Sequence, residues 1–235
     1  MQVVRRREDR GHAEHGWLDA RHTFSFASYR DPEQMGFRAL RVINEDRVAP
    51  GQGFGTHGHR DMEIITLVID GALEHKDSMG NGSILRPGML QRLSAGTGVT
   101  HSEFNHSSSQ PLHLYQIWLL PAQRGIEPGY EELNLASDNT PLRLAVSPDG
   151  RDDSMKIHQD ASIYVVKLEV GNSRTIDLEP ERHAWIQVVR GEILAGGGEG
   201  EQLALRAGDG MAISEETSLR MASASSGEAL LFDLA

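Results

Sequence analysis

The chain has 235 residues, 38% of them hydrophobic and 24% charged, which is the balance of an ordinary globular protein. The net charge of −11 argues against direct binding to nucleic acid, because phosphate-binding surfaces are basic, but it leaves a protein partner open. Cysteine is absent, which excludes disulfides and thiolate ligands, and no stretch has the pattern of a signal peptide or a membrane span. We therefore expect a cytoplasmic protein without a membrane segment.

Residues 1–30 are mostly polar and charged, with single aromatic residues between them. Residues 23–26 alternate polar and apolar side chains and predict a strand, and residues 40–44 predict the next one. His12, His15 and His22 also lie in or beside this region. They lack a second ligand at a useful spacing, so we expect them to be solvated and not metal-bound.

Short strands separated by glycine turns follow. The glycine-rich residues 49–55 are not a phosphate loop, because no Lys-Ser/Thr and no helix follow them. Residues 63–69 form an apolar run that predicts a buried strand, and Asp70-Gly71 predicts a hairpin that returns through residues 73–75. Further turn signals at residues 79–82 and 86–88 favour an all-β barrel or jelly roll.

Two pairs of metal-binding side chains lie on the strands around these turns. Successive side chains of a strand point to opposite faces, so His57 and His59 share one face, and so do His101 and Glu103. If the two strands lie side by side, three imidazoles and one carboxylate converge. These ligands suit Fe, Mn, Co, Ni, Cu or Zn and leave an octahedral ion two open positions. Glu63 has the same parity as His59, so parity leaves it open as a ligand.

The middle of the chain holds the expected domain boundary. Residues 113–120 predict a buried strand that ends at Pro121, and residues 121–140 contain two prolines and two glycines, which is typical of a connector. We predict one domain over residues 1–133 and another over residues 134–235. His75, His106 and His113 of the first domain could line its cavity, but a structural role is expected for each.

The second half repeats the spacing of the first. Residues 68–71 (VIDG) recur as residues 188–191 (VVRG), and residues 85–88 (LRPG) recur as residues 205–208 (LRAG), each 120 residues later. A shared offset indicates a duplicated barrel. Strands are expected over residues 163–170, 185–189 and 229–234. The same offset maps the four ligand positions onto Asp177, Glu179, Met221 and Ser223, so the C-terminal domain is expected to lack metal ligands.

The motifs resemble those of a known superfamily. His-x-His-x3-Glu from His57, a glycine turn, and Gly-x2-His-x3-Asn from Gly98 are similar to the paired motifs of the cupins. The longer strings HGHRDMEIITLVIDGALEHKDSMGNG, SAGTGVTHSEFN and LYQIWLLP resemble the pirin family of two-domain cupins, which includes bacterial proteins described as quercetin 2,3-dioxygenases. The resemblance covers nearly the whole chain and is most specific over residues 57–121.

The pirin resemblance implies a fold and a ligand set. The fold would be two tandem cupin barrels, with one divalent transition metal, iron first, in the N-terminal barrel. The ligands would be His57, His59, His101 and Glu103. Glu63 holds the usual cupin carboxylate position, which the pirin family does not use as a ligand.

The resemblance also implies a reaction, with two alternatives. A flavonol such as quercetin would bind the metal through its 3-hydroxyl group, Glu103 would accept the proton as general base, and O2 would open the ring with loss of carbon monoxide. The first alternative is a pirin that acts on protein partners as a regulator or redox sensor without catalysis. The second is a cupin that only binds a small molecule.

Overall fold

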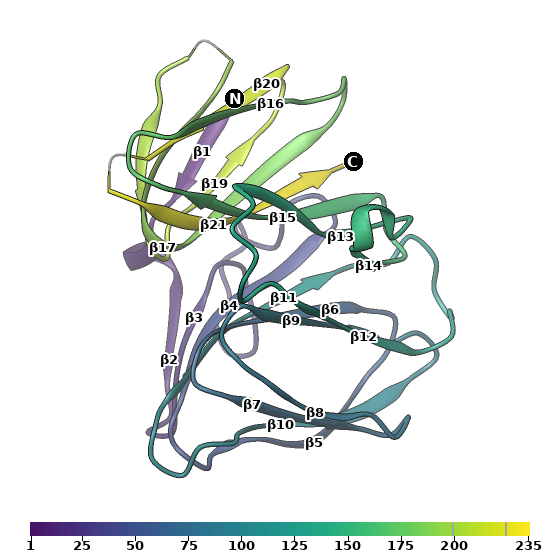
Figure 1. Ribbon diagram of the computed structural model, residues 1–235. Helices are drawn as coiled ribbons and strands as arrows, with labels where there is room; N and C mark the ends of the chain where they lie inside the picture. Colours follow the sequence, from purple (N-terminus) through teal and green to yellow (C-terminus); the bar gives the residue numbers. More distant parts are fainter. Residues whose placement is uncertain (199, 224) are drawn as a thin grey trace. The chain divides into compact units, whose positions relative to one another are not determined.

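The computed structural model describes residues 1–198, 200–223 and 225–235, and most of these residues lie in β-strands. Two compact units divide the chain (Figure 1). The first barrel comprises residues 11–138 and 157–159, and the second barrel comprises residues 1–10, 139–156 and 160–235. The predicted all-β class is confirmed. Within the described ranges, no helix is long and apolar enough to cross a membrane.

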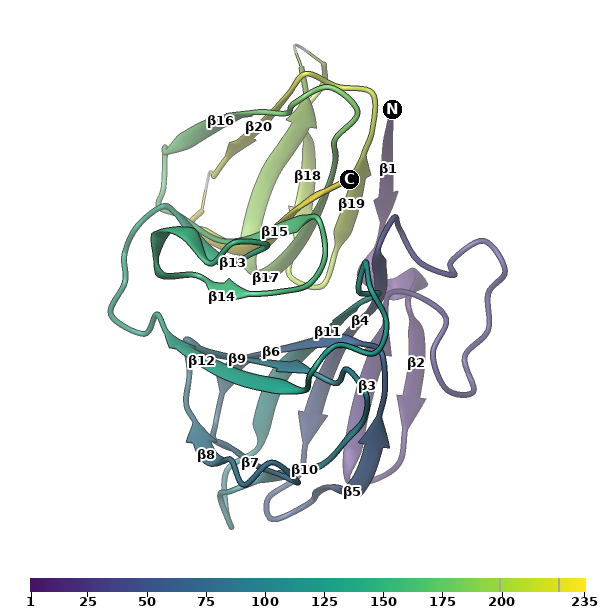
Figure 2. The same cartoon turned by 90° about the vertical axis from the view of Figure 1, so that its right-hand side faces the viewer.

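The first barrel consists of two antiparallel sheets that form two layers (Figures 1 and 2). The larger sheet has the strand order β12 (Gly129–Asn134), β9 (Met89–Ser94), β6 (Glu63–Asp70), β11 (Leu112–Leu119), β4 (Leu40–Val48), β3 (Leu18–His22), β2 (Gly11–Glu14). The smaller sheet has the order β5 (Gly53–His59), β10 (Val99–Asn105), β7 (Leu73–Asp77), β8 (Gly82–Leu85). The apolar run predicted as a buried strand is β6, whose residues are buried up to Ile69.

Two local predictions for this barrel are wrong. Residues 23–26, which were expected to form a strand, are irregular. The strand in this region is β3, which ends one residue earlier, at His22. The hairpin expected at Asp70-Gly71 does not form, because β6 pairs with β9 and β11 while β7 pairs with β8 and β10. At Gly71 the chain passes from the larger sheet to the smaller one with φ of +86°, and a Cβ there would lie 2.6 Å from the Pro111 carbonyl oxygen. Only glycine fits such a position.

The compact units differ in three places from the predicted division into residues 1–133 and 134–235. Residues 1–10 belong to the second barrel, because β1 (Gln2–Arg5) pairs with β19 (Gly210–Ile213), as Figure 2 shows. The expected connector over residues 121–140 contains β12, which pairs with β9, so the first barrel extends to Asp138. Residues 157–159 belong to the first barrel.

The second barrel repeats the pairings of the first. Its remaining strands are β13 (Leu142–Ser147), β14 (Met155–Lys156), β15 (Ala161–Leu168), β16 (Ser173–Asp177), β17 (His183–Gly197), β18 (Leu203–Arg206), β20 (Ser218–Ala222), β21 (Gly227–Leu234). β4 pairs with β11 as β15 pairs with β21, β5 with β10 as β16 with β20, and β6 with β9 as β17 with β19. The predicted duplication is confirmed by these equivalent pairings.

Candidate metal centre

The two strands that carry the predicted ligands are neighbours in the smaller sheet. β5 and β10 are antiparallel, with His101 opposite His57 and Val99 opposite His59. A β-bulge between His101 and Glu103 shifts the register of β10 against β5 and bends β10 at this point. A Cβ on Gly53 would lie 2.3 Å from the Glu103 carbonyl oxygen, so glycine at this position permits the close approach of β5 to the bulge.

The three imidazoles meet through their Nε2 atoms. His101 Nε2 lies 3.0 Å from His59 Nε2 and 3.2 Å from His57 Nε2. A metal–nitrogen bond is about 2.0–2.1 Å long, so two nitrogens at a right angle on one ion are about 3 Å apart. The spacing of the nitrogens therefore fits adjacent corners of a metal coordination shell.

Their protonation also fits ligation, which requires neutral imidazoles. His57 Nδ1 donates to the Gly55 carbonyl oxygen at 2.8 Å, which leaves the lone pair on Nε2. Burial, with a smaller contribution from His57, lowers the pKa of His59 to about 4. Burial and the neighbouring imidazoles lower the pKa of His101 to about 3. At neutral pH both rings are therefore uncharged.

Glu103 is buried against three polar side chains of the larger sheet. Its Oε1 accepts from Gln91 Nε2 at 2.8 Å and from Thr66 Oγ1 at 3.5 Å, and its Oε2 accepts from Gln116 Nε2 at 2.7 Å. Tyr130 in turn donates to Gln91 Oε1 at 3.1 Å. Burial raises the pKa of Glu103 to about 7, although these hydrogen bonds favour the charged form.

The raised pKa predicts how metal affinity depends on pH. If Glu103 is a ligand, the metal binds its carboxylate and not the acid, so below pH 7 metal binding would displace a proton from Glu103. We expect the affinity for Ni²⁺ to fall about tenfold for each pH unit below 7 and to level off above it. Calorimetric titration between pH 5.5 and 8 measures this slope. A flat profile in the wild type would contradict it, and Glu103→Gln should remove the slope.

A second cluster overlaps the first. His75, His101 and Glu103 offer ligand atoms that all lie within 4.8 Å of one another, whereas the cluster around His57 contains imidazoles alone. His75 is fully buried, stacks on Tyr130 with ring centroids 4.7 Å apart, and lies opposite Glu103 in the pairing of β7 with β10. The sequence predicts only a structural role for His75, because its place beside Glu103 depends on the strand register.

Glu63 forms its hydrogen bonds with residues outside this cluster. It is fully buried at the start of β6, and its Oε2 accepts from Ser94 Oγ at 2.6 Å. Its Oε1 is 3.0 Å from His158 Nδ1. The carboxylate at the usual cupin ligand position therefore binds the segment of residues 157–159 in this chain.

The remaining histidines divide into exposed and buried ones. His12 and His15 are exposed, as predicted, and His12 lies 2.9 Å from Asp19. The prediction is wrong for His22, which is buried because β3 faces inward and its Nδ1 bonds Asn44 Oδ1 at 2.8 Å. His106 lies beside Glu74 and His113 beside Glu45, and neither of them lines the cavity described below.

A cavity of about 430 Å³ opens beside the imidazoles, which is within the usual size of a small-molecule site. Aromatic rings form its walls: Phe26 and Trp118 lie edge to face at 5.4 Å, and Trp118 lies 5.0 Å from the His59 ring. Its lining residues are Trp17, Leu18, Ala20, His22, Phe26, Asn44, Asp46, Gly53, Phe54, Gly55, His57, His59, Glu103, Gln116 and Trp118. The cavity suits a flat aromatic ligand.

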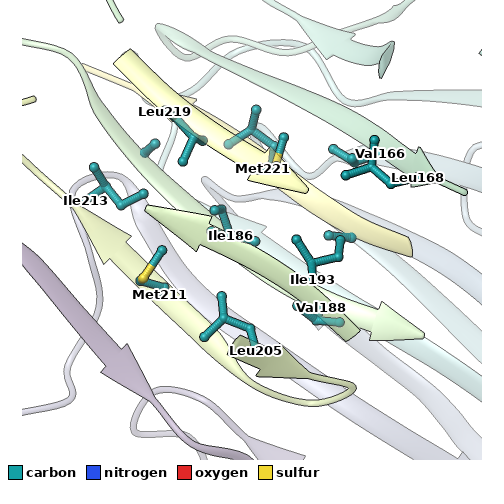
Figure 3. Close-up of a cluster of buried hydrophobic side chains, with 14 of the residues drawn as sticks. Val166, Leu168, Ile186, Val188, Ile193, Leu205, Met211, Ile213, Leu219 and Met221 are labelled. Carbon is teal, nitrogen blue, oxygen red and sulfur yellow. The ribbon is translucent and has the colours of Figure 1, made fainter. Parts of the chain in front are cut away.

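The second barrel has an apolar interior at the equivalent place. Met221 on β20 is fully buried, beside Leu219 of the same strand and in the same core as Ile186 (Figure 3). The 120-residue offset relates Met221 to His101, but Met221 pairs with Arg174 of β16, whereas Asp177, the offset equivalent of His57, pairs with Ser218. Among the described residues of this barrel, no group of three histidine or carboxylate side chains has metal-ligand spacing.

Comparison with known proteins gives the family. Residues 3–119 match the family model "Pirin", and residues 144–234 match the model "Quercetinase C-terminal cupin domain". The chain is 48% identical to a protein of Escherichia coli K12 named quercetin 2,3-dioxygenase, over all of this chain and 99% of that protein. It is also similar to the crystal structure of YhhW from Escherichia coli, with a TM-score of 0.94, 48% identity and coverage of 100% of this chain and 98% of the other. A nickel(II) complex of this bacterial pirin is equally similar, with a TM-score of 0.94, 47% identity and coverage of 100% and 99%.

Proposed function

The chain belongs to the pirin family of two-domain cupins, and we propose that it is a metal-dependent dioxygenase that opens the heterocyclic ring of flavonols with O2 and releases carbon monoxide. The observation that carries the proposal is the convergence of three imidazole nitrogens, with two of the three rings, His57 and His59, lining an aromatic cavity. The 48% identity to the quercetin 2,3-dioxygenase of Escherichia coli K12 supports quercetin as a substrate. We place the reaction in the cytoplasm.

The proposed ligands are His57, His59, His101 and Glu103, which together would hold one divalent ion. Such an ion supplies Lewis acidity, which makes a hydroxyl group bound to it easier to deprotonate. We propose iron as the native ion, with Mn, Co, Ni, Cu or Zn as alternatives that the same ligand types accept. The nickel(II) complex of the Escherichia coli pirin supports metal binding by this chain.

The side chains around the ion have distinct tasks in this proposal. The rings of Phe26 and Trp118 hold the flat substrate beside His59. Glu103 accepts the proton of the 3-hydroxyl group as general base. Gln91 and Gln116 hold its carboxylate oxygens, so the base keeps one orientation.

We propose a structural role for the C-terminal domain. Its barrel interior is filled by aliphatic side chains and methionines, among them Met221, which the 120-residue offset relates to His101. A packed apolar core offers neither ligands nor space for a substrate. One metal per chain follows from this proposal.

Oxygen uptake tests the proposed function. Protein loaded with Fe²⁺ and mixed with quercetin in air should consume O2 and bleach the flavonol absorbance, while protein stripped with a chelator should do neither. Reloading the stripped protein should restore the rate. Equal rates of O2 uptake for the loaded and stripped protein would mean that the flavonol is only autoxidised, and this would contradict the proposal.

A further inference from the structure

Two side chains of β11 connect the wall of the cavity to Glu103. Gln116 and Trp118 are two residues apart on the strand, so they point to the same face, and both line the cavity. Trp118 Nε1 donates to Gln116 Oε1 at 3.1 Å, and Gln116 Nε2 donates to Glu103 Oε2 at 2.7 Å. The indole, the amide and the carboxylate therefore form one hydrogen-bonded chain.

The indole decides which end of the Gln116 amide faces Glu103. An amide has an acceptor at one end and a donor at the other, and the two ends have nearly the same shape. The indole N–H is a donor only, so the amide atom beside Trp118 must be the oxygen. The amide nitrogen then donates to the carboxylate, in the charge-assisted kind of hydrogen bond that is strong in proteins. In the reversed orientation the amide oxygen would face the carboxylate, and two donors would meet at the indole.

The other amide beside Glu103 has a partner of a different kind. Gln91 Oε1 lies 3.1 Å from the Tyr130 hydroxyl group, which also lies 2.7 Å from Glu132 Oε1. A hydroxyl group can donate or accept, and its single hydrogen can go to Glu132. Tyr130 therefore accommodates either orientation of Gln91, whereas the indole imposes one orientation on the amide that it contacts.

Aromatic packing fixes the position of Trp118. The centroid of its ring lies 5.4 Å from that of Phe26 and 5.0 Å from that of His59, and both pairs are edge to face. Its neighbours in register are Val42 on β4 and Ile64 on β6. A ring that is held by packing keeps the direction of its N–H group, so the amide meets a fixed donor.

We propose that Trp118 is a positioning residue for the metal site: its indole N–H holds the Gln116 amide in the orientation that donates to Glu103, and this donation holds the carboxylate in place for the ion. The inference rests on the proposed function, because it takes Glu103 to be a ligand. Side chains that orient a metal ligand through hydrogen bonds typically contribute about 10–100-fold to metal affinity. The affinity for a metal therefore measures the positioning without any turnover.

A double-mutant cycle on Ni²⁺ affinity tests this chain of contacts. We expect Gln116→Leu to lose about tenfold or more in affinity by calorimetric titration. Trp118→Phe keeps an aromatic ring in the cavity wall but lacks the N–H group, and the loss of one hydrogen bond predicts a decrease of about fivefold. In the Gln116→Leu background the same substitution should cost less than about twofold, because the amide through which the indole acts is gone.

Trp17→Phe is the matched control for the loss of an indole. Trp17 lines the same cavity, and its ring packs edge to face on Phe54 at 5.3 Å. This variant should keep the Ni²⁺ affinity within about twofold of the wild-type value.

The indole N–H signals give a spectroscopic test of the same contact. The chain has three tryptophans, so the Trp118 proton NMR signal is assigned by its absence from Trp118→Phe. In Gln116→Leu this signal should move upfield, because the indole loses its acceptor, and it should stay in place in Trp17→Phe.

Unchanged Ni²⁺ affinity in Trp118→Phe would overturn the positioning role, and so would equal losses from this substitution with and without Gln116. An unmoved Trp118 signal in Gln116→Leu would show that the contact does not form. Unchanged Ni²⁺ affinity in Glu103→Gln would remove the ligand on which the role depends. These measurements need neither O2 nor a flavonol, so a failed oxygen-uptake assay and a failed positioning role give different results.

Discussion

Replacing His101 with alanine is expected to abolish metal binding. Its Nε2 lies within 3.2 Å of both other imidazole nitrogens, so the variant loses the nitrogen that contacts both of them. Loss of a residue that merely supports a ligand already costs about 10–100-fold in metal affinity, so loss of the ligand itself should exceed about 100-fold. Metal analysis and calorimetric titration with Ni²⁺ measure this loss.

His183 provides the matched control for this variant. It is a half-buried imidazole of the second barrel that lies 2.8 Å from Ser214, and His183→Ala should retain close to one ion per chain. Two ions per wild-type chain, or an unchanged stoichiometry in His101→Ala, would contradict the single site.

Replacing Glu103 with glutamine is expected to lower the rate of flavonol cleavage by about 100-fold or more, because the general base is lost. The substitution also turns an acceptor into a partial donor beside Gln91 and Gln116, whose amide groups already donate to this position. The loss should appear in kcat under metal saturation, which separates it from weaker metal binding.

Glu63→Gln is the matched comparison, since Glu63 is the other buried glutamate on the cupin motif. Glu63 bonds to Ser94 and His158, so this variant should keep its metal, and its cleavage rate should stay within a few-fold of the wild-type rate. Because two buried hydrogen bonds are disturbed, its stability should fall. A crystal structure with Glu63 at about 2.0–2.2 Å from the ion would overturn the ligand assignment.

The sequence predicted those features that depend on local periodicity. The parity of His57 with His59, the apolar run of β6 and the repeat spacing of 120 residues required no knowledge of the fold, and the structure contains each of them. The family motifs then gave the cupin class. In a cupin barrel the strands that carry the two motifs are neighbours, as β5 and β10 are here, so the paired histidines lie side by side.

Features that depend on which strands pair could not be predicted in the same way. The turn signal of Asp70-Gly71 is the same for a hairpin as for a crossing between sheets. The burial of His22 and the position of His75 beside Glu103 depend on register between strands far apart in the chain. Alternation tells which side chains share a face, but not which residue lies opposite on the next strand.

Carbon monoxide release tests the central claim most directly. Wild-type protein loaded in turn with Fe, Mn, Co, Ni and Cu is mixed with quercetin in air, and carbon monoxide is measured beside oxygen uptake. With at least one of these metals, the account predicts one carbon monoxide for each O2 consumed, which autoxidation does not produce. Absence of carbon monoxide with all five metals would contradict the dioxygenase and favour a pirin that regulates a protein partner.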